Sequence, residues 1–359
     1  MDYRLMCVLC RTKYGADYAG FRCARCGSIL EVAYKYDGKL VLYGSKITHK
    51  KYRSLFPVSG RLYSLGEGGT PLKKYKTGGG DIFLKLETKN PTNSFKDRGS
   101  SVEITKAKEL GFKEVCCAST GNMGISTATY AARFGLKCTI FISKDADAKK
   151  ISLIKKAGAE IVELAGDFNK ALETAERFSK VNKVFLCGDY HYRKEGQKSV
   201  MYEIVDQLDG APDAIILPVG NSTLLAAVYK ALAEFKMFGK ITKMPKLIGV
   251  QAEGCDPLVR AYRNKKRIKY TKPHTDADAI AVGYPTFGFE GLIALKATKG
   301  IALSVDDREI EDARVRLADD GISAEPGGAA AFAGALKLQK KGTATLKWKD
   351  TVCLVTGNN

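Results

Sequence analysis

The chain has 359 residues, of which 45% are hydrophobic and 27% are charged. This length exceeds what one hydrophobic core usually spans, and the apolar fraction excludes a disordered chain, so we expect a globular protein of two or three lobes. The formal net charge of +19 is compatible with nucleic acid, anionic metabolites or a basic proteome, and selects no function by itself. No run of about 18 apolar residues and no secretory signal pattern occurs, which predicts a soluble, cytoplasmic protein with no membrane partner.

Four of the ten cysteines form two C-x2-C pairs near the N-terminus, Cys7 with Cys10 and Cys23 with Cys26. The twelve residues between the pairs are typical of a zinc ribbon. Four thiolates turned toward one point close a tetrahedral Zn²⁺ shell, which predicts a structural metal site. The alternative is four reduced, unligated cysteines. A ribbon serves either as a nucleic-acid-binding module or as a small appendage to an enzyme.

From residue 82 onward, short apolar runs alternate with amphipathic stretches of helix length. The run IFLKLE precedes a predicted helix near 95 to 110, and EVCCA precedes one near 123 to 134. Further runs are KCTIFI, AEIVEL, VFLCG, AIILPVG and KLIGVQ. This alternation predicts an α/β fold whose mostly parallel sheet is covered by helices on both faces. Ligands in such folds bind where strands end and helices begin.

Lys96 lies in one of four loops rich in glycine or small polar residues, which read NPTNSFKD, STGNMG, PVGNST and LVTGNN. Pro91 ends the preceding strand, and Ser94 with Asp97 forms a weak capping box, so Lys96 is expected in the first turn of a helix. The positive end of the helix dipole and burial both disfavour an ammonium ion there. A neutral, nucleophilic lysine that forms a Schiff base therefore becomes accessible, although a lone lysine at a helix start is more often a surface residue.

The string NPTNSFKDRG (90 to 99) closely resembles the pyridoxal-phosphate lysine motif of fold-type II enzymes, the tryptophan synthase beta-like group, and more narrowly that of threonine synthases. The resemblance covers nearly the whole chain and includes the N-terminal ribbon. Its further motifs are LGEGGTPL (65 to 72), STGNMG (119 to 124), YRKEGQKS (192 to 199), PVGNST (218 to 223), GVQAEGCDPLVRA (249 to 261) and EPGGAAA (325 to 331).

The domain organisation that the resemblance implies is two doubly wound parallel-sheet lobes plus a small N-terminal zinc ribbon. Residues 1–45 would form the ribbon. Residues 46–110 and 190–359 would form a large domain that binds pyridoxal phosphate, and residues 111–189 a small domain. The implied assembly is a homodimer.

The resemblance also implies roles for single residues. Lys96 would carry the cofactor and act as the catalytic base, and PVGNST would cradle the cofactor phosphate at a helix N-terminus. The residues implied to bind the cofactor are Lys96, Asn122, Val219, Gly220, Asn221, Ser222, Thr223 and Thr356. Those implied to bind the substrate are Ser119, Thr120 and Arg193, the first two for its carboxylate and Arg193 for its leaving phosphate.

The reaction that the resemblance implies is that of threonine synthase, a lyase that converts O-phosphohomoserine and water to threonine and phosphate. The chain departs from the family pattern mainly around the substrate, because residues 187 to 193 read CGDYHYR and lack the family's Asn-Ser and Asn-Pro pairs. Two alternatives within the enzymes are a cysteate synthase-like reaction of O-phosphoserine with sulfite, and threonine dehydration. A distant alternative is a non-catalytic nucleic-acid-binding protein, although no nucleic-acid partner is expected.

Overall fold

The computed structural model describes residues 2–36, 38–119, 121–144, 148–165, 168–342, 346 and 348–359. The chain divides into two compact units. Unit 1 consists of Met1–Glu67 and Lys96–Ser199, and unit 2 consists of Gly68–Phe95 and Val200–Asn359. Within the described ranges, no helix has the length and apolar character needed to cross a membrane.

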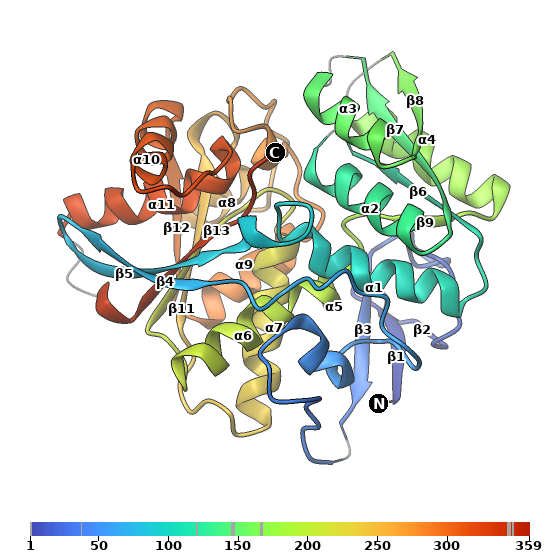
Figure 1. Ribbon diagram of the computed structural model, residues 1–359, viewed down its shortest axis with the longest axis horizontal. Helices are drawn as coiled ribbons and strands as arrows, with labels where there is room; N and C mark the ends of the chain where they lie inside the picture. Colours follow the sequence, from blue (N-terminus) through green and yellow to red (C-terminus); the bar gives the residue numbers. More distant parts are fainter. Residues whose placement is uncertain are drawn as a thin grey trace. The chain divides into compact units, whose positions relative to one another are not determined.

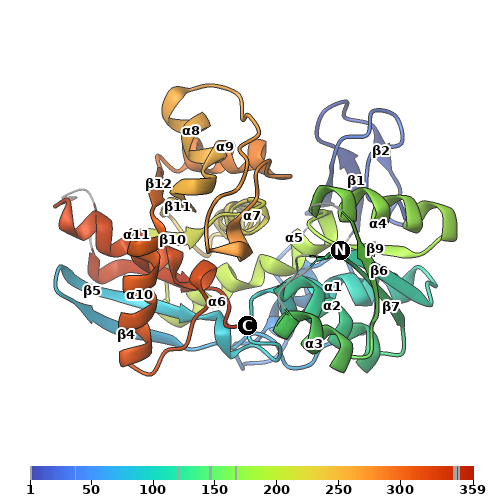
Figure 2. The same ribbon diagram turned by 90° about the horizontal axis from the view of Figure 1, so that it is seen from above.

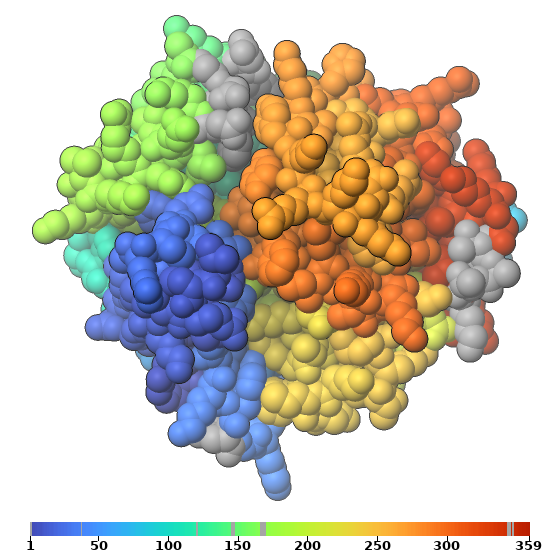
Figure 3. All heavy atoms as spheres, turned by 180° about the vertical axis from the view of Figure 1, so that it is seen from behind, coloured from blue at the N-terminus to red at the C-terminus, as the bar shows by residue number. Residues whose placement is uncertain are grey.

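Unit 1 begins with a small antiparallel sheet in the order β2-β1-β3. Its strands are β1 (Asp2–Cys7), β2 (Lys13–Tyr14) and β3 (Leu30–Lys35), and the short helix η1 (His49–Leu55) follows. Tyr3, Leu5 and Cys7 alternate with more exposed residues along β1, as expected for a strand with one buried face. The N-terminal residues, blue in Figure 3, form one continuous surface on this unit.

The rest of unit 1 is built on a parallel sheet in the order β8-β7-β6-β9. Its strands are β6 (Glu114–Ala118), β7 (Lys137–Ser143), β8 (Glu160–Leu164) and β9 (Phe185–Cys187). Its helices are α1 (Lys96–Glu109), α2 (Asn122–Arg133), α3 (Ala148–Lys156), α4 (Phe168–Asn182) and α5 (His191–Gln197). Helix α4 covers one face of the sheet and α2 with α3 covers the other (Figure 2). Helix α1 packs against α2 and α5.

Unit 2 contains a six-stranded sheet in the order β12-β11-β10-β13-β5-β4, which is parallel except for the edge strand β4 (Figure 1). The strands are β4 (Leu72–Thr77), β5 (Gly80–Leu86), β10 (Ala214–Pro218), β11 (Lys246–Ala252), β12 (Ile301–Val305) and β13 (Thr351–Val355). Every residue of β10 and β13 is buried. Continuous burial is what a parallel strand covered on both faces requires, and it explains the uninterrupted apolar runs.

Helices cover both faces of the unit 2 sheet. They are α6 (Ser199–Leu208), α7 (Thr223–Met237), α8 (Pro257–Asn264), α9 (Gly288–Ala297), α10 (Asp307–Asp319) and α11 (Pro326–Lys340). Short 3-10 helices are η2 (Glu87–Lys89), η3 (Glu253–Cys255), η4 (Asp278–Ile280) and η5 (Trp348–Asp350). Helix α11 packs on one face, and α7 and α9 pack on the other (Figure 2). The predicted α/β class with two parallel-sheet lobes and a small N-terminal sheet is confirmed.

Candidate active site

Lys96 is the first residue of α1, which places it in the first helical turn, where the sequence predicts it. Its amine Nζ lies 3.8 Å from Oδ1 of Asp189, and the two side chains are 18% and 8% exposed. Asp189 stands in the turn between β9 and α5. The lysine amine in unit 1 therefore faces a carboxylate that is nearly buried.

A buried ion pair connects the turn that holds Asp189 to the start of α1. Nη2 of Arg193 donates to the carboxylate of Glu103, and Nη1 donates to the backbone carbonyl of Lys96 at 3.2 Å. Glu103 also accepts the backbone N–H of Gly188 at 2.8 Å. Because Glu103 follows Lys96 by two helical turns, both lie on the same face of α1. Glu103 and Arg193 thus hold the Lys96 backbone and the turn together.

Arg193 makes its contacts inside the protein. Besides Glu103, Nη2 reaches the hydroxyl oxygens of Ser100 at 3.3 Å and Thr127 at 3.2 Å. The side chain is 0% exposed, and its Nε, also buried, has no hydrogen-bond partner among the described residues. Burial raises the pKa of Glu103 to about 7, although Arg193 and the Gly188 N–H oppose that shift. A substrate phosphate would have to displace Glu103, so the predicted phosphate-binding role of Arg193 stays a prediction.

The loop STGNMG connects β6 to α2. The hydroxyl of Ser119 accepts the backbone N–H groups of Gly121 at 3.3 Å and Gly124 at 3.0 Å, and it therefore caps the helix. Asn122, the first residue of α2, is 7% exposed. Thr120, the other residue predicted to bind the substrate carboxylate, lies outside the described residues.

In unit 2, the loop PVGNST connects β10 to α7 and is fixed at both sides. The N–H of Val219 donates to the carbonyl of Val250 in β11 at 2.8 Å. The side-chain oxygen of Asn221 accepts from both the N–H and the hydroxyl of Thr286 at 3.2 Å. A Cβ on Gly220 would lie 3.2 Å from Cα of Ile280, which leaves little room for any larger residue.

Ser222 and Thr223 carry two buried hydroxyl groups that have no hydrogen-bond partner among the described residues. Ser222 precedes α7 with a left-handed backbone (φ 63°), and the two residues are each 3% exposed. Buried polar groups are normally satisfied, and the N-terminus of a helix attracts anions. A phosphate group whose oxygens accept these two O–H groups would satisfy both, so the loop fits the cofactor phosphate.

Thr356 follows β13 and is 4% exposed. Its carbonyl accepts the N–H of Phe95 at 3.0 Å, and Gly357 forms a β-bridge with Ser94. The end of the chain therefore holds the residues that immediately precede Lys96. The hydroxyl of Ser94 is buried without a hydrogen-bond partner in the described part of the chain, so its share of the predicted helix cap is not formed.

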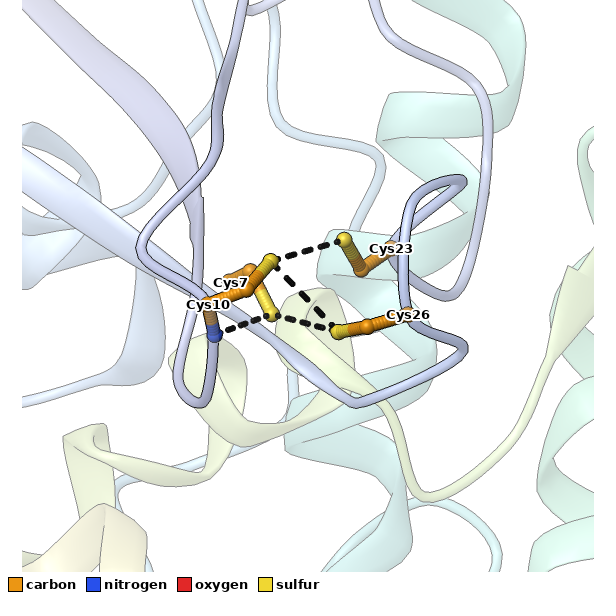
Figure 4. Close-up of side chains that lie close together, drawn as sticks. All are labelled: Cys7, Cys10, Cys23 and Cys26. Carbon is orange, nitrogen blue, oxygen red and sulfur yellow. Dashed lines mark hydrogen bonds between the residues drawn. The ribbon is translucent and has the colours of Figure 1, made fainter.

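The four N-terminal cysteines converge as the ribbon spacing predicts (Figure 4). Their sulfur atoms all lie within 4.8 Å of one another, with 3.4 Å between Cys7 and Cys26 and 3.5 Å between Cys10 and Cys23. Metal binding requires thiolates, and the four sulfur atoms are close enough together to share one ion. Four convergent sulfurs fit a tetrahedral Zn²⁺.

The predicted site residues fall into two sets. Unit 1 holds Lys96, Ser119, Asn122 and Arg193, and unit 2 holds residues 219 to 223 and Thr356. Sequence reasoning missed Asp189 and Glu103. The position of Glu103, two helical turns after Lys96, could have indicated that the two residues share one face of the helix. Asp189 lies inside the segment that departs from the family pattern.

Comparison with known proteins agrees with this geometry. The family model described as "Pyridoxal-phosphate dependent enzyme" matches residues 63–357. The threonine synthase of Methanocaldococcus jannaschii is 36% identical and that of Methanosarcina acetivorans 38% identical, each over 375 residues that cover 98% and 99% of this chain and 91% of each relative.

Solved structures share the fold at lower identity. Maize serine racemase superposes with a TM-score of 0.71 at 24% identity, covering 81% of this chain and 88% of the racemase. The processed form of threonine deaminase isoform 2 from Solanum lycopersicum gives 0.69 at 24% identity, covering 81% and 84%. Because the family model spans most of the sequence and the curated relatives align over nearly all of it, the chain belongs to the threonine synthase family of fold-type II, pyridoxal-phosphate dependent enzymes.

Proposed function

We propose that this enzyme converts O-phosphohomoserine and water to threonine and phosphate. The observation that carries the proposal is Lys96 at the first position of α1, within a motif that resembles the cofactor lysine of threonine synthases. Similarity to proteins named threonine synthase over nearly the whole chain supports the same reaction. We further propose a homodimeric assembly and a zinc ion at the four cysteines.

The residues that would hold pyridoxal phosphate are Lys96 and Asn122 in unit 1, and residues 219 to 223 with Thr356 in unit 2. The hydroxyls of Ser222 and Thr223 would donate to its phosphate. The bound cofactor supplies an electron sink that makes the proton on Cα of the substrate acidic. Thr356 would offer a neutral hydroxyl to the ring nitrogen of the cofactor. A neutral group does not hold that nitrogen protonated, so the ring would withdraw electrons less strongly.

Proton transfer falls to Lys96. Its amine would remove the Cα proton as a general base and would move a second proton at Cβ before water adds there. Ser119 and Thr120 would orient the substrate carboxylate. Arg193 would hold the leaving phosphate only after exchanging its bond with Glu103.

A second candidate is a related reaction on another activated amino acid, either O-phosphoserine with sulfite or the dehydration of threonine. The segment 187 to 193 favours it. Gly188 supplies no hydroxyl, and buried Tyr190 and His191 stand where the family carries the Asn-Pro pair. The ion pair between Arg193 and Glu103 also favours this second candidate, because it leaves Arg193 fewer N–H donors for a phosphate.

Product analysis separates the candidates. The purified enzyme is offered O-phosphohomoserine, O-phosphoserine with sulfite, and threonine in parallel, with Lys96→Ala as the inactive control. Threonine and phosphate from the first substrate support the proposal. Cysteate from the second or 2-oxobutanoate from the third, without turnover of O-phosphohomoserine, would replace it by the corresponding alternative.

A further inference from the structure

A cavity of about 540 Å³ lies in unit 1, and none of its lining residues has a role in the proposed reaction. Its walls come from the start of β1, the segment 39 to 43 after β3, the end of η1 with the residues that follow it, and Lys106 of α1. Sites for small ligands commonly measure about 300 to 1,000 Å³. The cavity is therefore large enough for a small organic molecule.

Hydrogen bonds within unit 1 hold the walls of this cavity together. The hydroxyl of Ser54 donates to the backbone carbonyl of Val41, which ties η1 to the segment after β3. The backbone N–H of Ser59 donates to Oε1 of Glu109 at 2.8 Å, which ties the residues after η1 to α1. Walls that are fixed in this way form the cavity before any ligand arrives.

Cationic side chains outnumber carboxylates among the described residues that line the cavity. The cations are Lys39, Arg53 and Lys106, and the carboxylate is Asp2. Lys106 is 6% exposed and pairs with Glu109 at 3.3 Å. Arg53 forms no ion pair within the described part of the chain. Even with Glu109 counted, positive charge is in excess, so the cavity favours an anion.

Apolar and aromatic surface lies beside these cations. The guanidinium of Arg53 lies 4.4 Å from the ring centre of Tyr43, and Nζ of Lys106 lies 5.2 Å from that of Tyr3. Val41, which also lines the cavity, is 53% exposed, and Tyr43 is 45% exposed. A hollow that combines exposed apolar surface with a few polar groups is typical of a ligand site.

We propose that this cavity binds a small organic phosphate that carries an apolar ring. Arg53 is the main phosphate contact, because its planar guanidinium donates paired hydrogen bonds to phosphate oxygens. Lys39 adds a second positive charge. The ring of the ligand packs against Val41 and Tyr43, whose exposed apolar surface is then removed from water. This inference does not depend on the proposed function.

The test measures binding of 1-naphthyl phosphate by isothermal titration calorimetry. It uses the full-length enzyme, loaded with pyridoxal phosphate and then freed of excess cofactor. We expect a Kd below about 1 mM. Naphthol, which lacks the phosphate, and inorganic phosphate, which lacks the ring, should each bind at least about tenfold more weakly.

Two variants locate the site. Arg53→Gln removes the guanidinium and should raise the Kd at least about tenfold. Val41→Glu adds a carboxylate at an exposed position of the wall and should raise the Kd at least about threefold, so it serves if Arg53→Gln does not fold. Arg177→Gln and Val181→Glu make the same changes at exposed positions on α4 and should alter the Kd by less than about twofold.

The proposal would be overturned by the absence of 1-naphthyl phosphate binding up to about 10 mM, or by a Kd within about twofold of wild type in both Arg53→Gln and Val41→Glu. Inorganic phosphate that binds as tightly as 1-naphthyl phosphate would show an adventitious ion only and would also overturn it. A Kd that responds to Ser222→Ala and not to Arg53→Gln would assign the probe to the loop of residues 219 to 223, with the same consequence.

Discussion

Glu103 on α1 and Arg193 on α5 form an ion pair whose side chains are 2% and 0% exposed. The two side chains carry opposite charges and both are buried. Either one without the other would be an uncompensated charge in the interior. This relationship assigns Arg193 a structural contribution whether or not it also meets substrate.

Arg193→Met should therefore destabilise the protein strongly. Removal of one partner of a buried pair typically costs about 3 to 5 kcal/mol, because the remaining group either stays charged without its partner or has to take up a proton. Arg314 offers a matched control, since it pairs with Glu311 at an exposed site. Arg314→Met should cost less than about 1 kcal/mol. Urea unfolding followed by circular dichroism measures both, and equal losses would contradict the structural role.

The kinetics of a second variant at Arg193 distinguish a structural role of this residue from a role in binding phosphate. If Arg193 binds the leaving phosphate in the transition state, Arg193→Lys should reduce turnover of the phosphorylated amino acid by about 10²-fold to 10³-fold. Loading of pyridoxal phosphate, which does not depend on the leaving phosphate of the substrate, should be unchanged. Turnover by Arg193→Lys equal to that of wild type would leave Arg193 with a supporting role alone.

Glu103 should make stability depend on pH. Its folded-state pKa of about 7 lies above its ordinary value of 4.5 because the side chain is buried. The folded state then binds the proton more tightly, so the contribution of Glu103 to stability is fully present below about pH 4.5 and is lost as pH rises through about 7. Wild type should lose stability relative to Glu103→Gln across that interval, by at most about 1.4 kcal/mol per pH unit.

The control for this pH dependence is Glu311, whose pKa is lowered by its hydrogen bond with Arg314. A lowered pKa gives stability that is present above the unfolded-state value and is lost as pH falls. Glu311→Gln and wild type should therefore differ by a constant amount between pH 5 and 7. A stability difference between wild type and Glu103→Gln that is equally flat would show that Glu103 is ionised throughout.

The sequence predicts most of the fold because its signals are local. Apolar runs such as AIILP correspond to strands of a sheet buried on both faces, and the paired cysteines converge because each pair lies within one turn. The edge strand β4, which carries three lysines in LKKYKT, was not predicted, since its alternation buries only Tyr75. The antiparallel pairing of β4 depends on the neighbouring strand β5 rather than on the composition of β4 itself.

The candidate site is predictable only where a motif occupies one loop. The contact between Glu103 and Arg193 joins residues 90 positions apart, and the proximity of Asp189 to Lys96 depends on the same packing of α5 against α1. No local pattern encodes such contacts. The backbone of the same loop is a further example: Asn93 has a φ of 56°, a left-handed conformation that asparagine tolerates.

The cysteine cluster should hold one zinc ion per chain, because four thiolates fill a tetrahedral shell. Replacing Cys23 and Cys26 together by serine should remove the metal and lower the Tm, while the remaining folded protein still binds cofactor. Cys255→Ser, at a buried thiol outside the cluster, should retain the zinc. Metal analysis by mass spectrometry decides, and a zinc-free native preparation with an unchanged Tm would contradict the assignment.

Ser222→Ala and Thr223→Val should each weaken pyridoxal-phosphate binding. A hydrogen bond to a charged group contributes about 1.5 to 3 kcal/mol, so the Kd should rise about 10-fold to 100-fold for each variant. The cofactor-free protein should lose no stability, because neither hydroxyl has a partner among the described residues. Ser304→Ala, which removes a buried bond to Asp256, should show the reverse pattern of lower stability and unchanged affinity.

Borohydride reduction of the loaded enzyme shows whether Lys96 carries the cofactor. Reduction fixes pyridoxal phosphate to the lysine that binds it, and peptide mapping by mass spectrometry identifies the position. We expect one modified peptide, containing Lys96 at the start of α1, and no modification in Lys96→Ala. A cofactor fixed to any other lysine, or no fixed cofactor in the loaded wild-type enzyme, would contradict it.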